Sequence, residues 1–84
     1  MNTAVSVVAT GLAAEVRSAL LLSGLTDASF TVVPMTACGI ERAEAHAADT
    51  GAARAALRAA GYRTELVCGH DGVYLAVMRR KGQS

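Results

Sequence analysis

The chain has 84 residues, fewer than the roughly 100 to 200 that usually form one domain, so its length excludes two separate cores. Apolar residues make up 52% of the chain, but eighteen of them are alanine and only three residues are aromatic, so the core has few large side chains. The formal net charge is +1, yet residues 1–78 hold five basic and seven acidic residues. Residues 1–78 are therefore mildly acidic, and they lack the several aligned Lys or Arg residues with which proteins usually bind duplex DNA.

Cysteine and histidine usage excludes the common metal and redox motifs. Cys38 and Cys68 stand thirty positions apart with no CxxC motif and no Cys/His cluster, so we expect no metal and no other cofactor. The chain starts with no basic segment ahead of an apolar one, and Glu15 and Arg17 interrupt its most apolar stretch. We therefore expect a cytoplasmic protein without a membrane segment. Its many arginines and alanines are typical of a GC-rich bacterial coding sequence.

The N-terminal part predicts a strand followed by a helix. Residues 3–9 are short, β-branched and apolar, which favours a buried strand. Thr10 can cap the next segment, whose larger apolar residues fall on one helical face. Gly24 ends this helix in a left-handed conformation, and Leu25 can then contact Leu20 as in a Schellman motif.

The middle of the chain gives the weakest pattern. Residues 30–33 (Phe-Thr-Val-Val) predict a second strand, which we expect to stop at Pro34 because proline has no N–H for a ladder. Residues 35–39 are interpreted as a loop. Residues 40–50 hold four alanines and two glutamates, with Ile40 as the one large apolar residue, and predict a helix that lies loosely on the surface.

A second helix is predicted over residues 52–60, ahead of a hairpin. Arg54 and Arg58 share one side of this helix at i, i+4 spacing, and Gly61 ends it as Gly24 ends the first helix. The Asp-Gly signal in residues 69–72 then predicts a turn between the two strands that flank it, residues 62–68 and residues 73–78.

The predicted element order is β-α-β-α-β-β. This order favours an α+β two-layer, ferredoxin-like sandwich in which two helices cover one face of a four-stranded mixed sheet. Residues 1–78 form its single domain. Residues 79–84 form a basic, flexible tail.

Residues 53–68 and 73–78 resemble the helix, glycine stop and hairpin of ACT-type amino-acid-binding regulatory domains. The resemblance covers about a third of the chain and implies a small-molecule-binding regulatory domain. The family order is strand, helix, strand, strand, helix, strand, with an acidic-x-Pro-Gly turn after the first strand. Here Pro34 and Gly39 are not adjacent, and the element order also departs from that of the family.

The loops that follow the first two predicted strands suggest a ligand site. If these strands are parallel neighbours, their carboxyl ends bring the two loops together, and ligands of open α/β sheets favour that edge. Helix N-termini at this edge would attract a small anion such as a carboxylate or phosphate. The predicted ligand-binding residues are Thr10, Gly11, Thr36, Cys38 and Gly39.

A cysteine-dependent function is the first alternative. Cys38 is predicted near a helix N-terminus, where the thiolate form is favoured, so it is the candidate nucleophile of a small enzyme or sulfur carrier. A nucleophile needs a positioned base, and the sequence does not place His46 or His70 beside it. Cys68 is interpreted as a structural strand residue. The sequence therefore favours a non-catalytic binding or interaction module.

The uncovered face of the sheet predicts an interface. Tyr74 and Met78 are expected on that face, and Leu21 is a further exposed apolar residue. Such surface on a small protein predicts a homodimer or docking on a larger protein partner. The second alternative is a nucleic-acid accessory protein that uses Arg54, Arg58 and the basic tail.

Overall fold

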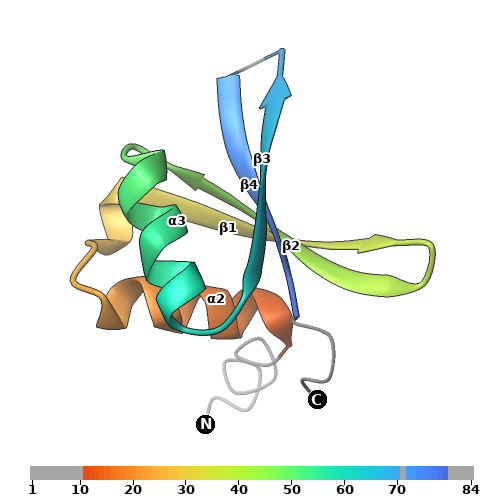
Figure 1. Cartoon of the computed structure of the whole chain (residues 1–84), viewed down its shortest axis with the longest axis horizontal. Coiled ribbons are helices and arrows are strands. Elements are labelled where there is room, and N and C mark those ends of the chain that lie inside the picture. The colour runs from red at the N-terminus through yellow and green to blue at the C-terminus, as the bar shows by residue number, and fades with distance from the viewer. Residues whose placement is uncertain (1–10, 71, 80–84) are drawn as a thin grey trace, which may run out of the picture.

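The computed structural model describes residues 11–70 and 72–79. Its elements follow the order α-β-β-α-β-β, in a small α+β fold, with a short 3-10 helix (η1) before the first strand. Figure 1 shows the two helices, α2 and α3, packed near the crossing of two long hairpins. The elements are α2 (Leu12–Leu22), η1 (Asp27–Ser29), β1 (Phe30–Ala37), β2 (Ile40–Ala47), α3 (Thr50–Ala59), β3 (Arg63–Gly69) and β4 (Gly72–Met78).

Within residues 11–70 and 72–79, the sheet has four strands in the order β1-β2-β4-β3, and every pairing is antiparallel. The prediction of a mixed sheet is therefore wrong, because it rested on parallel βα units. Its four strands included residues 3–9, which lie outside the described residues. The fourth strand of the actual sheet is β2, from a segment that the sequence had suggested was helical.

The prediction of a loop and helix over residues 35–50 is wrong for two reasons. Pro34 does not end β1, because β1 is an edge strand and the missing N–H costs no ladder bond when it faces outward. Cys38 and Gly39, with φ of 53° and 77°, form a two-residue turn of the kind that closes hairpins. The alanines at alternate positions of β2 then face the core, and this tertiary contact overrides their helix propensity.

The described residues form two similar α-β-β units. Ala37 and Ile40 flank the first turn as Gly69 and Gly72 flank the second, a shift of 32 residues (69 minus 37) that holds along both hairpins. The β2–β4 pairing is centred on Glu44 opposite Ala76, and these two residues are related by the same shift. The two units are therefore arranged about an approximate two-fold axis that passes between the central strands.

Both helices end as the sequence predicts, in Schellman motifs. The Leu25 N–H donates to the Leu20 carbonyl at 3.2 Å, and the Tyr62 N–H donates to the Leu57 carbonyl at 3.0 Å. Gly24 and Gly61 hold the required left-handed conformation, with φ of 104° and 97°. These stops turn the chain back, so that each hairpin lies beside its own helix.

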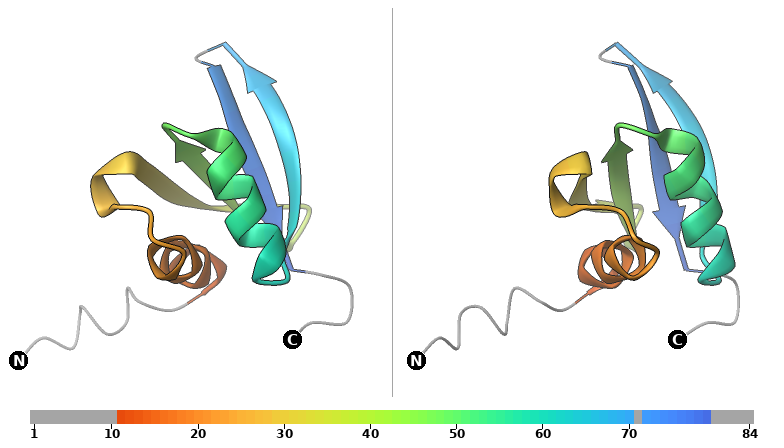
Figure 2. Two further views of the ribbon diagram at one scale, coloured as in Figure 1. Left: turned by 60° about the vertical axis from the view of Figure 1, so that its left-hand side comes forward. Right: turned by 90° about the vertical axis from the view of Figure 1, so that its left-hand side faces the viewer.

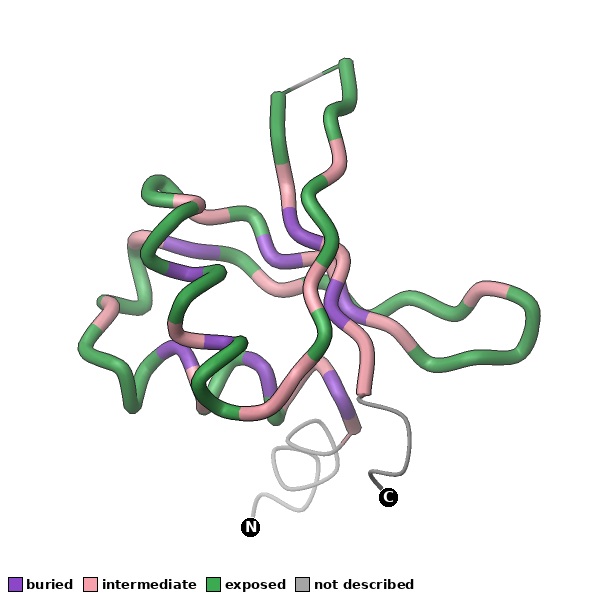
Figure 3. The backbone as a smooth tube through the Cα atoms, viewed as in Figure 1, coloured by how far each residue is buried: buried purple, intermediate pink, exposed green. Residues whose placement is uncertain are grey.

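The core lies between the two helices and one face of the sheet. Buried residues of α2 and α3 meet Phe30 and the core-facing residues of β2 and β4, so both helices cover the same face (Figure 2). Burial is confined to this centre, whereas the hairpin ends are exposed (Figure 3). The buried residues are Leu12, Val16, Leu20, Phe30, Ala43, Ala45, Ala53, Leu57, Leu75 and Val77.

Candidate anion-binding pocket

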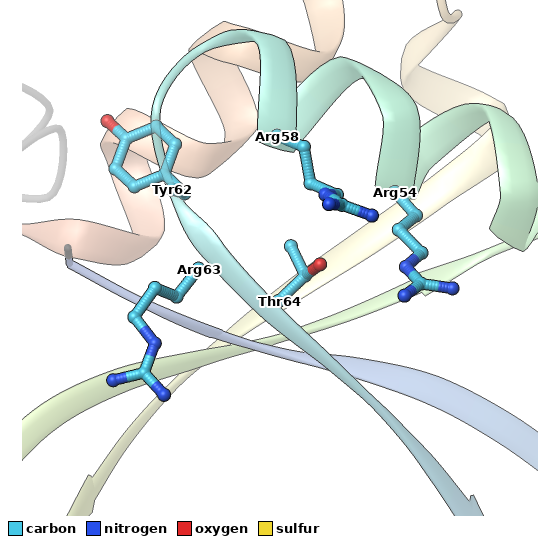
Figure 4. A pocket seen from close by; sticks show the side chains of 5 residues that line it. All are labelled: Arg54, Arg58, Tyr62, Arg63 and Thr64. Carbon is cyan, nitrogen blue, oxygen red and sulfur yellow. The ribbon is translucent and has the colours of Figure 1, made fainter.

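A pocket of about 440 Å³ lies between α3 and the edge strand β3. It is lined by three arginines, a tyrosine and a threonine: Arg54, Arg58, Tyr62, Arg63 and Thr64. Figure 4 shows that the α3 arginines extend over Thr64, while Arg63 extends from the other side of β3. The guanidinium groups of Arg54 and Arg58 therefore lie together over the helix side of β3, whereas Arg63 borders the pocket from the opposite side of the strand.

Helix and strand geometry explain this convergence. Asp49 caps α3 by accepting a 3.0 Å hydrogen bond from the Ala52 N–H, and the helix buries Ala53 and Leu57 against the sheet. Arg54 and Arg58, spaced i, i+4, therefore share an exposed side. The Gly61 stop places β3 directly beneath this side, and the alternation of the strand turns Thr64 towards the helix.

Several polar groups of the pocket lack an ion-pair or hydrogen-bond partner among the described residues. Among the described residues, none of the ion pairs involves Arg54, Arg58 or Arg63. The Thr64 Oγ1 is buried and has no hydrogen-bond partner in the part of the chain that the structure describes. Like charges at i, i+4 repel each other, and an unpaired buried hydroxyl destabilises the fold, so an oxyanion would relieve both penalties.

Tyr62 connects the pocket to a second polar cluster at the start of α2. Its hydroxyl donates to Glu15 Oε1 at 2.9 Å, and Arg79 binds both oxygens of the same carboxylate at 2.8 and 2.7 Å. The Arg79 hydrogen bonds hold the pKa of Glu15 below its ordinary value, with the Tyr62 bond as a smaller cause. Burial, followed by the bond to Glu15, raises the pKa of Tyr62. The bond to Glu15 also raises the pKa of Arg79.

The predicted anion site at the start of α2 is occupied by a carboxylate of the chain itself. Glu41 Oε2 accepts a 2.8 Å hydrogen bond from the Leu12 N–H, and a Cβ on Gly11 would lie 2.9 Å from the same oxygen. A free anion at this helix end would therefore have to displace Glu41. Thr10 lies outside the described residues.

The other predicted ligand residues lie at the end of the β1–β2 hairpin. Thr36 pairs with Glu41 within the sheet, and Cys38 and Gly39 form the exposed turn. No helix begins at this turn, so the predicted helix N-terminus beside Cys38 is wrong. Antiparallel pairing also removes the shared carboxyl edge on which the predicted two-loop site depended.

The candidate bases and the second cysteine lie elsewhere. His46 stacks on Tyr74 across the open face, with ring centroids 5.0 Å apart, and His70 lies in the β3–β4 turn. Cys68 is exposed near that second turn rather than buried as a structural residue. The thiol of Cys38 is thus at the end of one hairpin, whereas His70 is at the end of the other.

The three predicted interface residues do not share one surface. Alternation along β4 places Tyr74 and Met78 on the sheet face opposite the buried Leu75 and Val77. Leu21 is exposed, but it belongs to α2 and lies on the helix side of the sheet. The open face also carries Val33, which was expected there, and Met35 and Ile40, which are exposed apolar residues that the sequence did not identify.

The sequence predicted two of the five residues that line the arginine pocket. Arg54 and Arg58 were predicted on one side of a helix, but Tyr62, Arg63 and Thr64 were missed. The available signal was the glycine stop itself: a strand that begins two residues after Gly61 must run back beside the helix.

Comparisons with known proteins give no relative. No protein-family model matches the chain, and no curated protein or solved structure matches it significantly. The ACT-type resemblance therefore stays a prediction. Within residues 11–70 and 72–79, no helix is long and apolar enough to cross a membrane. The same residues hold no group of three or more Cys, His, Asp or Glu side chains placed to bind a metal ion.

Proposed function

We propose that this chain is a non-catalytic binding module whose ligand presents an anionic group to the pocket of Arg54, Arg58, Arg63 and Thr64. The observation that carries the proposal is the pair of guanidinium groups of Arg54 and Arg58, which extend over the buried Thr64 hydroxyl. Among the described residues, neither arginine has an ion pair and the hydroxyl has no hydrogen-bond partner. Arginine suits this role because its planar fork donates two parallel hydrogen bonds to a carboxylate or phosphate.

A compact anion fits this pocket better than a nucleic acid does. Among the described residues, the arginines without ion pairs are Arg54 and Arg58 on α3, Arg63 at the start of β3 and Arg42 on the open face. The first residue of the basic tail, Arg79, is paired with Glu15 and Glu41. Binding along a nucleic acid backbone needs several cations in a row. The role of Cys38 as a nucleophile has no comparable support, because its hairpin turn lies apart from both histidines.

The proposal is tested with inorganic sulfate as the probe, by thermal shift and by NMR titration of the amide signals. A ligand at one hundred times its Kd stabilises a fold by about 2.7 kcal/mol, which a thermal shift detects. Arg58→Gln and Arg54→Gln should each weaken sulfate binding at least tenfold. Arg42→Gln is the matched control, because Arg42 lies on the open face and also has no ion pair among the described residues. Equal loss in the control would contradict the pocket assignment.

Self-association through the open face is a second candidate, favoured by the charge pattern of that face. Glu44 and Glu65 lie in one cross-strand row of the open face. Arg42 and Arg63 each come two residues earlier in the same strands and lie in the next row of that face. A second copy related by a two-fold axis parallel to the rows can place each arginine row over a glutamate row. Exposed apolar residues beside these rows would add buried area.

Sedimentation equilibrium across protein and salt concentrations tests this second candidate. We expect a dimer that weakens with salt and that Met78→Glu or Tyr74→Glu converts to a folded monomer. Leu22→Glu, on an exposed residue of α2, is the control and should leave the dimer unchanged. A wild-type protein that stays monomeric at high concentration would rule out this interface.

A further inference from the structure

The two outer strands of the sheet are equivalent by position but differ in their exposed backbone. Pro34 of β1 pairs with Ala43, and Leu66 of β3 pairs with Leu75, so Pro34 and Leu66 correspond under the approximate two-fold axis. Edge strands present unpaired N–H and C=O groups that can pair with another chain, and proline blocks such pairing. The β1 edge is therefore interrupted at its centre, whereas β3 has an ordinary residue at the same point.

The register indicates which β3 residues direct their backbone outward. Gly69 and Gly72 flank a two-residue turn, and such flanking residues form a hydrogen-bonded pair. Because antiparallel pairing uses every second residue, the backbone groups of Thr64 and Leu66 point to the free edge. The same alternation directs the nitrogen of Pro34 outward on β1, which explains why a proline is tolerated there.

Side chains beside the two edges differ as well. Counted back from the glycine stops at Gly24 and Gly61, the helix position that carries Arg54 on α3 carries Arg17 on α2, and Arg17 is paired with Asp27. The position of Arg58 is taken by Leu21 in the first unit. Positive charge without ion pairs among the described residues is therefore found at the β3 edge, where strand addition is open, rather than at the β1 edge, where proline interrupts it.

We propose that the β3 edge binds an extended acidic segment of a partner protein as an added strand, with an acidic side chain of that segment in the arginine pocket. This inference rests on the proposed anion-binding function and names its ligand class. Main-chain hydrogen bonds would provide the affinity of such strand addition, and pockets for alternate side chains would provide its specificity.

The β3 edge also defines a short sequence pattern for this segment. Thr64 and Leu66 lie two residues apart on the helix-facing side of β3, with Thr64 in the pocket and Leu66 51% exposed. Alternate residues of an added strand face the same side. The segment therefore carries an acidic and an apolar residue separated by one position: the acidic residue meets Arg54 and Arg58, and the apolar residue covers Leu66.

A second copy of this chain is a poorer occupant of the same edge. A two-fold pairing of β3 with β3 would bring Arg54, Arg58 and Arg63 of both copies to one strand pair. Like charges brought together across an interface oppose association. An acidic partner has the complementary charge instead.

The test uses the full chain and blocked seven-residue peptides that contain Glu-Val-Leu or Leu-Val-Glu flanked by threonine and valine. Binding is followed by NMR, and the expected signature is shift changes and slowed hydrogen exchange along β3 but not along β1. The matched variant is Leu66→Pro, which copies the proline of β1. It should weaken peptide binding at least tenfold and leave sulfate binding unchanged, whereas Arg58→Gln should weaken both.

The outcomes separate this inference from the proposed function. Sulfate binding in the pocket with no peptide binding to β3 would overturn strand addition alone, and absence of sulfate binding would overturn the proposed function as well. If Leu66→Pro does not fold, N-methylation of alternate peptide amides on the wild-type chain serves instead. Strand addition requires that one set of alternate N-methyl groups abolishes binding and the other set does not. Equal binding by both sets would refute it.

Discussion

Glu41 caps a helix that precedes it by 29 residues: its carboxylate oxygen accepts a 2.8 Å hydrogen bond from the Leu12 N–H. The residue at the N-cap position itself is Gly11, which has no side chain to do this. The cap therefore comes from β2, and it ties the first turn of α2 to the sheet. The Glu41 carboxylate also occupies the N-terminus of α2, where the sequence suggested that an external anion would bind.

Removal of this cap should destabilise the fold. Glu41→Ala is expected to lower the free energy of unfolding by about 1 kcal/mol, the typical value of a lost N-cap. Glu41→Gln should lower it less, because the amide oxygen can still accept from Leu12 although the charge is lost. Urea unfolding measures both changes. Glu65→Ala, on the open face, is the control; a cost equal to that of Glu41→Ala would show that the cap contributes nothing.

The Glu15 cluster should make the fold sensitive to acid. Arg79 and Tyr62 lower the pKa of Glu15 from its ordinary value of 4.5, so the folded state binds this proton more weakly than the unfolded state does. The stabilisation is therefore present above pH 4.5 and is lost as the pH falls through the folded pKa. Unfolding measured from about pH 7 to about pH 3 should show this loss. Glu15→Gln should flatten that part of the profile; an unchanged profile would contradict the linkage.

The fold could be predicted from the sequence where local chemistry leaves few options. Glycine followed by an apolar residue determined both helix ends, and an Asp-Gly signal determined the second hairpin. The β2 strand could not be predicted in the same way, because Ala43, Ala45 and Ala47 have higher helix than strand propensity. These alanines recur at every second position, as in a strand with one buried face. The pattern favours a strand only when the two helices cover that face and bury the alanines.

The site was less predictable because it depends on which strands are neighbours. Arg54 and Arg58 could be assigned to one side of a helix from spacing alone. Their relation to Thr64 requires the chain reversal at Gly61, and the exposure of the β3 edge requires the complete strand order. The repeated unit within the described residues is a helix followed by a hairpin, and the sequence did not predict this repeat because β2 was not expected to be a strand.

The helix stop at Gly24 can be tested with a matched pair of glycine substitutions. Gly24→Ala should destabilise the fold by about 1 kcal/mol, because a Cβ at a φ of 104° is strained. Gly51→Ala is the same chemical change in the first turn of α3, where the added Cβ meets Asp49 Oδ1 at an ordinary 3.6 Å. It should be neutral or stabilise by up to about 1 kcal/mol. Thermal unfolding with equal effects at the two positions would contradict the Schellman assignment.

The hairpin turn at Cys38 allows one substitution to test stability and chemistry together. Cys38 and Gly39 both have positive φ, as a type I′ turn requires, and asparagine is favoured over cysteine at the first of these positions. Cys38→Asn should therefore raise the free energy of unfolding by a few tenths of a kcal/mol, since asparagine tolerates positive φ better. Because the turn lies apart from Arg54 and Arg58, sulfate binding should stay at the wild-type level. A variant that folds with higher stability but no longer binds sulfate would instead place the thiol in the functional site.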